Sequence, residues 1–235
     1  GPAPHPSRLF LFDVDGTLLS ARGAGRVALT RAIEATYGTA GAIGRYDFRG
    51  KTDPRIVLDV LGEVGVAEGV IRAGLDACFR AYLGELEALL EDGARVEVMP
   101  GIADVVRALA ARDEAMVGLL TGNIEAGARL KLRPTGLLPL FRVGAFGSDA
   151  ADRRRLPAIA CARARRLTGR AFPFASVTII GGTPLDVDCA RACGARAVAV
   201  ATGHHPVAEL AACGPDLLFG DFSDVAAALE ALTGR

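Results

Sequence analysis

The segment LFLFDVDGTL, residues 9–18, joins an apolar strand to a pair of carboxylates. The apolar run at residues 9–12 is typical of a strand buried on both faces. Asp13, Asp15 and Thr17 follow it at once. A carboxylate beside a buried strand is costly without a partner, and open α/β sheets bind ligands at the carboxyl ends of their strands. The segment therefore predicts a functional site, whereas an Asp-Gly turn alone would explain neither the second carboxylate nor the threonine.

The composition is that of a globular protein without net charge. The chain has 235 residues, of which 51% are hydrophobic and 23% charged, and its formal net charge is +0. Neutrality argues against a general nucleic-acid partner, and no apolar run reaches the roughly 20 residues that span a bilayer. The five cysteines are scattered, offer no zinc set and are typical of free thiols in a reducing compartment. We therefore expect a cytoplasmic protein, a monomer or homodimer, without nucleic-acid or membrane partners.

Two textures of sequence predict two structural units. Residues of about 21–91 show only helical periodicity, whereas beyond residue 93 strands and helices alternate. The predicted strands after the first cover residues 115–120, 177–180, 197–200 and 217–219, and helices cover 102–111 and 156–166 among others. Such alternation predicts an α/β fold, a parallel Rossmann-like sheet core with helices on both faces. We expect this core at residues 8–19 and 94–235, and an inserted all-helical cap domain, hinged beside the carboxylates, at residues 20–93.

Polar residues also follow two of the later strands. Thr121, Gly122 and Asn123 come directly after one, and a hydroxyl, a glycine and an amide can cradle phosphate oxygens. Asp186 follows another strand, after a glycine pair. Between them, the arginine run at residues 153–155 opens a helix and offers a cation, although a solvated helix face is the alternative for such a run.

These pieces, in this order, resemble the haloacid dehalogenase superfamily of phosphatases and related enzymes. Residues 13–19 resemble its first motif, Thr121 its second, a basic residue its third and residues 181–186 its fourth. The helical block resembles the cap of the phosphoglycolate phosphatase-like branch. The resemblance extends over nearly the whole chain and implies a magnesium-dependent phosphatase that acts on a small phosphorylated metabolite.

The resemblance also implies a role for each motif residue. Asp13 would attack phosphorus and form an aspartyl phosphate, while Asp15 would serve as general acid and then general base. Mg²⁺ would be held by Asp13 and by the backbone carbonyl of Asp15, with Asp186 as the remaining distal carboxylate. Thr121 and the two residues after it would hold the phosphoryl oxygens.

The third-motif cation is an arginine here, where the family usually has lysine. Alignment of the helix leaves Arg153 and Arg154 open, and the position of Arg153 directly after Asp152 favours it. We expect Arg153 to offset charge in the transition state and Arg154 to lie near the substrate.

The fourth motif departs from the family at Gly182, where the pattern has an aspartate that binds the metal directly. Activity could persist at higher magnesium concentration, Asp186 could become a direct ligand, or turnover could be largely lost. The last case would give a binding or regulatory protein with the same fold, and this is our alternative to the phosphatase.

The expected cap supplies a basic loop, residues 48–53, ahead of a helix with Asp53 as its predicted N-cap. Arg49 and Lys51 in this loop would favour a small anionic leaving group, although they are also typical of an ordinary solvated turn. Metal-independent dehalogenases and phosphoglucomutases are alternative enzyme branches. Asp15 argues against the first, and the sequence does not separate the second.

Overall fold

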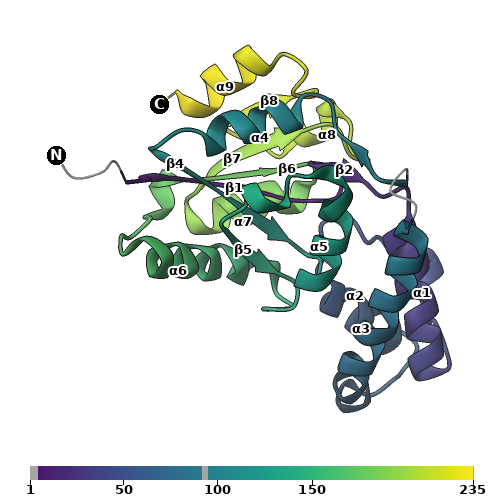
Figure 1. Cartoon of the computed structure of the whole chain (residues 1–235). Helices are drawn as coiled ribbons and strands as arrows, with labels where there is room; N and C mark the ends of the chain where they lie inside the picture. The colour runs from purple at the N-terminus through teal and green to yellow at the C-terminus, as the bar shows by residue number, and fades with distance from the viewer. Residues whose placement is uncertain (1–4, 92–94, 235) are drawn as a thin grey trace.

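The computed structural model describes residues 5–91 and 95–234, and within them the chain forms a six-stranded sheet (Figure 1). The strand order is β5-β4-β1-β6-β7-β8, and every neighbouring pair is parallel. The bounds are Arg8–Phe12 for β1, Ala115–Thr121 for β4, Val143–Phe146 for β5, Val177–Gly181 for β6, Arg196–Val200 for β7 and Leu217–Phe219 for β8. The predicted α/β fold is confirmed, and only β5 among these strands lacked a prediction.

Helices cover both faces of the sheet, which explains the uninterrupted apolar run of β1. Phe10 and Phe12 pack into one hydrophobic cluster, Leu9 and Leu11 into a second, and none of the four is more than 1% exposed. Helices α4 (Ile102–Ala110) and α9 (Val225–Thr233) lie on the first face, opposite α6 (Leu156–Thr168) and α7 (Pro184–Cys193) on the second (Figure 1). Helices α5 (Glu125–Leu132) and α8 (Val207–Ala212) complete the alternation with the strands.

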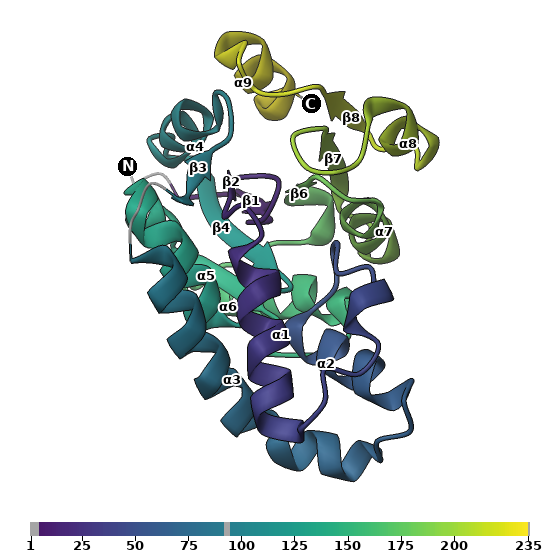
Figure 2. The same cartoon turned by 90° about the vertical axis from the view of Figure 1, so that its right-hand side faces the viewer.

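The block predicted to be helical contains α1 (Ala24–Tyr37), α2 (Asp53–Gly62) and α3 (Glu68–Leu90). Helices α1 and α3 lie side by side along most of their length (Figure 2). The chain enters this block through β2 (Leu19–Ser20) and leaves it through β3 (Glu97–Val98), and the two short strands pair antiparallel. The expected boundary at residues 93 and 94 falls outside the described residues, so the division into core and cap stays a prediction. Among the described residues, no helix combines the length and apolarity needed to cross a membrane.

The loop at residues 48–53 is docked on the core by hydrogen bonds that involve its backbone or its threonine. The carbonyl of Gly50 accepts from Arg153 Nη1 at 3.0 Å, and Thr52 Oγ1 donates to the carbonyl of Ala151 at 2.7 Å. The amide of Asp53 donates to the carbonyl of Gly122 at 2.8 Å. A side chain at Gly122 would meet the backbone of this loop, because its Cβ would lie 2.2 Å from the carbonyl oxygen of Lys51.

The start of α2 corrects one sequence prediction. Thr52, and not Asp53, is the N-cap, because the Thr52 hydroxyl accepts from the amide of Arg55 at 3.2 Å. Asp53 is the first helical residue, and its Oδ2 accepts from the amide of Ile124 in the core at 2.8 Å. A threonine immediately before the aspartate satisfies the cap, and this frees the aspartate for a long-range contact.

We expect Gly122→Ala to displace the docked loop, since the added methyl group overlaps a backbone oxygen that cannot rotate away. Amide hydrogen exchange at Asp53 and Ile124 should accelerate, and the free energy of unfolding should fall by about 1–3 kcal/mol. Gly44→Ala is the matched control within the helical block, because a methyl group there meets no described atom within 4 Å. Unchanged exchange at both amides in Gly122→Ala would show that the loop is not held at this point.

Candidate active site

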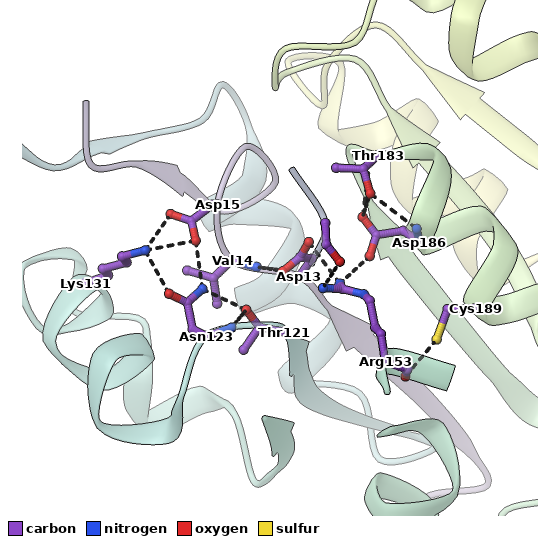
Figure 3. Close-up of polar contacts among 11 residues, drawn as sticks. Asp13, Val14, Asp15, Thr121, Asn123, Lys131, Arg153, Thr183, Asp186 and Cys189 are labelled. Carbon is purple, nitrogen blue, oxygen red and sulfur yellow. Dashed lines mark hydrogen bonds and ion pairs between the residues drawn. The ribbon is translucent and has the colours of Figure 1, made fainter. Parts of the chain in front are cut away.

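The ends of three adjacent strands bring the predicted motifs together (Figure 3). β1 lies between β4 and β6, and Phe12 pairs with Leu119 on one side and with Ile180 on the other. One residue beyond Phe12, the amide of Asp13 donates to the carbonyl of Ile180 at 3.0 Å. Asp13 therefore stands at the carboxyl edge of the sheet, between the loops that follow β4 and β6.

Asp13 is buried and held from two directions. Its Oδ1 accepts from the amide of Val14 at 2.7 Å, and its Oδ2 lies 3.1 Å from Arg153 Nη2. Burial and the nearby carboxylate of Asp186 raise the pKa of Asp13 to about 7, against the lowering effect of Arg153 and the Val14 amide. The carboxylate is thus in an environment that favours additional positive charge close to it.

Arg153 is the arginine of the run that reaches Asp13. Its Nη2 also contacts Asp186 Oδ1 at 2.5 Å, so one guanidinium bridges two buried carboxylates. Arg154 points elsewhere, with its side chain 60% exposed and paired to Asp188 at 2.6 Å. The run forms a short 3₁₀ helix, Arg153–Arg155, N-capped by Asp152, and with three residues per turn successive side chains point in different directions.

Both carboxylate oxygens of Asp186 already have protein donors. Oδ1 faces Arg153, and Oδ2 accepts from the amide and hydroxyl of Thr183 at 3.2 and 3.0 Å in a capping box at the start of α7. A Cβ at Gly181 would lie 2.1 Å from this carboxyl group, so only glycine leaves room for it. The structure thus gives Asp186 two tasks, to cap α7 and to pair with Arg153.

Gly182 leaves a neighbouring hydroxyl without a partner. Thr17 is fully buried, and its Oγ1 has no hydrogen-bond partner among the described residues. A Cβ at Gly182 would lie 3.6 Å from this hydroxyl and 3.2 Å from the carbonyl oxygens of Gly16 and Val200. The unpaired hydroxyl therefore faces the position from which the family's metal-binding aspartate would project.

The remaining donors still fit magnesium, with one carboxylate fewer. Mg²⁺ needs only one or two carboxylates when water and substrate phosphate complete its octahedron. Asp13 supplies a carboxylate and Asp15 a main-chain carbonyl, both hard oxygen donors. Over residues 5–91 and 95–234 no group of three or more His, Cys, Asp or Glu side chains is placed to hold a metal ion. The residues fit a weakly held ion that a phosphate group would help to bind.

Asp15 is held by a group that the sequence did not reveal. Lys131 Nζ lies 3.0 Å from both Oδ1 and Oδ2 of Asp15, and Asn123 Nδ2 donates to Oδ2 at 2.7 Å. Partial removal from water opposes ionisation of Asp15, but Lys131 and Asn123 outweigh this effect and lower the pKa of the carboxyl group. The sequence motifs do not include α5, and they give Lys131 no role. Its only signal is that it shares a helical stripe with Ala128 and Leu132, both buried.

Thr121 is oriented by the residue two positions on. Its Oγ1 accepts from the amide of Asn123 at 3.1 Å and from Asn123 Nδ2 at 2.8 Å. Two accepted hydrogen bonds leave the hydroxyl hydrogen of Thr121 free to donate to another acceptor. The turn at residues 121–123 thus offers a preset donor beside Asp13.

The structure does not bring the charges of Arg49 and Lys51 to Asp13. Arg49 Nε pairs with Asp47 Oδ1 at 2.8 Å, and Lys51 Nζ lies 4.1 Å from the ring centre of Tyr46. Both charges are engaged by residues that directly precede the loop, and the loop contacts Arg153 through the backbone carbonyl of Gly50 instead. An open cavity of about 550 Å³ lies beside Arg153, and Lys51 and Arg154 line it.

Comparison with known proteins identifies relatives over most of the chain. A family model described as haloacid dehalogenase-like hydrolase matches residues 8–194. A phosphoglycolate phosphatase from Synechococcus elongatus is 31% identical over 138 residues, which is 59% of this chain and 60% of that protein. The match thus spans less than two thirds of the cyanobacterial protein.

Solved structures share the fold at low sequence identity. A hydrolase from Pseudomonas syringae has a TM-score of 0.72 at 19% identity, covering 96% of this chain and 99% of that one. A predicted phosphoglycolate phosphatase from Haemophilus somnus has a TM-score of 0.68 at 17% identity, covering 97% and 99%. At such identities the likeness establishes the arrangement of elements alone.

The buried carboxyl group of Asp53 predicts a pH dependence of stability. Burial raises the pKa of Asp53 to about 6, although Lys131 and the Ile124 amide lower it. The folded chain then binds this proton more tightly than the unfolded chain does, so the contribution to stability is complete below about pH 4. This contribution to the free energy of unfolding is lost as the pH rises to about 6, and the whole loss is on the order of 3 kcal/mol.

Asp53→Asn should remove this pH-dependent loss of stability. Urea unfolding of the variant and of the unmodified protein, in EDTA between pH 4 and 7, measures the loss as the difference between their free energies of unfolding. Asp113→Asn, which changes an exposed acid, serves as the control. Parallel stability curves for Asp53→Asn and the unmodified protein would exclude a raised pKa at this position.

Proposed function

The chain belongs to the haloacid dehalogenase-like hydrolase family, and we propose that it is a cytoplasmic phosphatase for monoesters of small phosphorylated metabolites. The observation that carries this proposal is the meeting of Asp13, Thr121 and Arg153 at one edge of the sheet, although Thr121 and Arg153 lie 108 and 140 residues beyond Asp13 in the sequence. A nucleophilic carboxylate, a hydroxyl donor and a fixed cation are the groups that phosphoryl transfer from an ester requires.

In the proposed first step, Asp13 forms a bond to phosphorus while the bond to the ester oxygen breaks, which gives an aspartyl phosphate. The Val14 amide fixes Oδ1 of the nucleophile, and Arg153 offsets negative charge on the phosphoryl group. Asp15 donates a proton to the departing alcohol. In the second step Asp15 takes a proton from water, the water oxygen attacks phosphorus, and Asp13 is released together with inorganic phosphate.

The neighbouring residues have proposed roles as well. The free hydroxyl hydrogen of Thr121 and the backbone of Gly122 and Asn123 would hold the phosphoryl oxygens. Asp13 and the carbonyl of Asp15 would hold Mg²⁺, which when bound supplies positive charge at the phosphoryl oxygens. Asp186 would hold Arg153 in place, and it is the remaining fourth-motif carboxylate that could approach the ion.

For the substrate, we propose a small anionic phosphate ester of the phosphoglycolate type. The curated cyanobacterial relative supports this class. The cavity beside Arg153 is lined by carboxylates (Asp59, Asp152 and Asp188) as well as by cations, so its charge does not select an anion by itself. Arg49 lies one residue from this wall and would add to the positive potential only after leaving Asp47.

Asp13→Asn should abolish hydrolysis of p-nitrophenyl phosphate, because an amide cannot act as the nucleophile. We expect a loss of at least about 10³-fold in kcat, measured as release of nitrophenolate in the presence of Mg²⁺. Acid quench of the unmodified protein with ³²P-labelled substrate should trap phosphate on Asp13. Equal rates for the two proteins would refute the proposed role of this carboxylate.

The alternative function, a binding or regulatory protein without efficient turnover, has one specific observation in its favour. Gly182 stands where the family motif has a carboxylate, and Thr17 is left without a partner beside it. Absence of hydrolysis at every magnesium concentration would favour this alternative over the phosphatase.

We expect Gly182→Asp to tighten Mg²⁺ binding by roughly tenfold and to raise turnover at limiting magnesium, because it adds a charged oxygen ligand. The backbone must yield by a few tenths of an ångström, since the new Cβ lies 3.2 Å from two carbonyl oxygens. Gly182→Asn has the same size without the charge and is the matched control. Calorimetric titration with Mg²⁺ compares them, and identical curves for the two variants would contradict a carboxylate vacancy at this site.

A further inference from the structure

We propose that Lys131 is a positioning residue that ties the carboxylate of Asp15 to the turn at residues 121–123. The inference rests on the proposed function, because it takes Asp15 as the proton donor and the turn as the phosphoryl cradle. What it adds is that one buried ammonium group sets the distance and orientation between the Asp15 carboxylate and this turn.

All three hydrogens of the buried Lys131 ammonium group have acceptors. The side chain is 6% exposed, and an ammonium group has three hydrogens to donate. Three acceptors surround it: both oxygens of Asp15 at 3.0 Å and Asn123 Oδ1 at 2.7 Å. A buried lysine without such partners would be strongly destabilising, so its place in the fold depends on this set.

Asn123 connects this ion pair to Thr121. The amide group of Asn123 donates through Nδ2 to Asp15 Oδ2 at 2.7 Å and to Thr121 Oγ1 at 2.8 Å. The acceptor oxygen of the same amide faces Lys131, which determines which way the amide points (Figure 3). Lys131 therefore orients the carboxylate directly and the threonine hydroxyl through Asn123.

The helical block covers the ammonium group of Lys131. A Cβ at Gly25 of α1 would lie 3.0 Å from Lys131 Nζ and 3.8 Å from Tyr82 Oη of α3. Lys131 itself belongs to α5 in the expected core, so its end lies where the helical block meets the core. Asp15, by contrast, has a side chain that is 49% exposed, and Asn123 is the other side chain in the described part of the molecule that donates to it.

This arrangement has a consequence that depends on the leaving group. An alkoxide or a weakly acidic phenolate needs a proton as it departs, whereas nitrophenolate leaves without one. A displaced Asp15 therefore slows poor leaving groups far more than good ones. A merely structural role for Lys131 would lower all rates by one factor.

The test uses Lys131→Met, which keeps most of the side-chain length and removes all three donors. A series of substituted phenyl phosphates of decreasing leaving-group acidity is assayed at saturating Mg²⁺. We expect kcat/KM to fall on the order of 10²-fold for the poorest leaving group and only a few-fold for p-nitrophenyl phosphate. Arg129→Met, which removes an exposed cation from the same helix, should leave the series unchanged. An equal loss across the series would overturn the inference.

Two further measurements separate this inference from the proposed function. In an Asp15→Asn background, Lys131→Met should cause no further loss, because it acts through the group already removed, and additive losses would contradict the inference. If Asp15→Asn itself leaves the leaving-group dependence unchanged, the proposed proton donor is wrong. A crystal structure of Lys131→Met should show the Asp15 carboxylate turned away from Asn123, and an unmoved carboxylate would overturn the inference without any assay.

A milder variant covers the case in which Lys131→Met does not fold. Gly25→Ala adds a methyl group against the flexible end of Lys131 and keeps its charge. It should change the leaving-group dependence in the same direction by a smaller factor. Gly84→Ala in α3, where a methyl group meets no described atom within 4 Å, is its control. Identical series for the two alanine variants would count against the inference.

Discussion

The guanidinium group of Arg153, buried between two carboxylates, is the interaction on which the arrangement of the site depends. It contacts Asp13 at 3.1 Å and Asp186 at 2.5 Å, and all three side chains are almost inaccessible to solvent. Charges in such a setting are tolerated only when they are paired. With both carboxylates ionised the group would carry one net negative charge, which is consistent with the raised pKa of Asp13 and with room for a further cation.

A second charged cluster lies on the other side of the same strand end, and in it one cation pairs with one carboxylate. Lys131 pairs with Asp15 and lowers the pKa of that carboxyl group, whereas the pKa of Asp13 is raised. Two acids two residues apart are thereby given opposite environments. The lowered pKa favours ionised Asp15, the form that a general base needs in the second step, whereas a cation bound beside Asp13 would favour the ionised form that the nucleophile needs.

The helical block contributes to the site mainly through its backbone and its packing. Gly50, Thr52 and Asp53 contact the segments that carry the second and third motifs, whereas the charges of Arg49 and Lys51 are engaged by residues just before the loop. Contacts of this kind depend on close approach, which explains why Gly122 has no side chain. The sequence pattern pointed to the side chains of this loop, whereas the atoms that contact the core are those of its backbone and of Thr52 and Asp53.

The sequence by itself determined the fold class and the strand ends at which Asp13, Thr121 and Asp186 stand. Those features are encoded in adjacent residues, because an apolar run followed by polar residues reports burial and its end. Only the tertiary structure decided that Arg153 and not Arg154 meets Asp13, that Thr52 caps α2, and that Lys131 holds Asp15. These choices join residues up to 140 positions apart. Each contact depends on which side chain of a helical turn points toward a distant strand. The local periodicity of the sequence does not determine that direction.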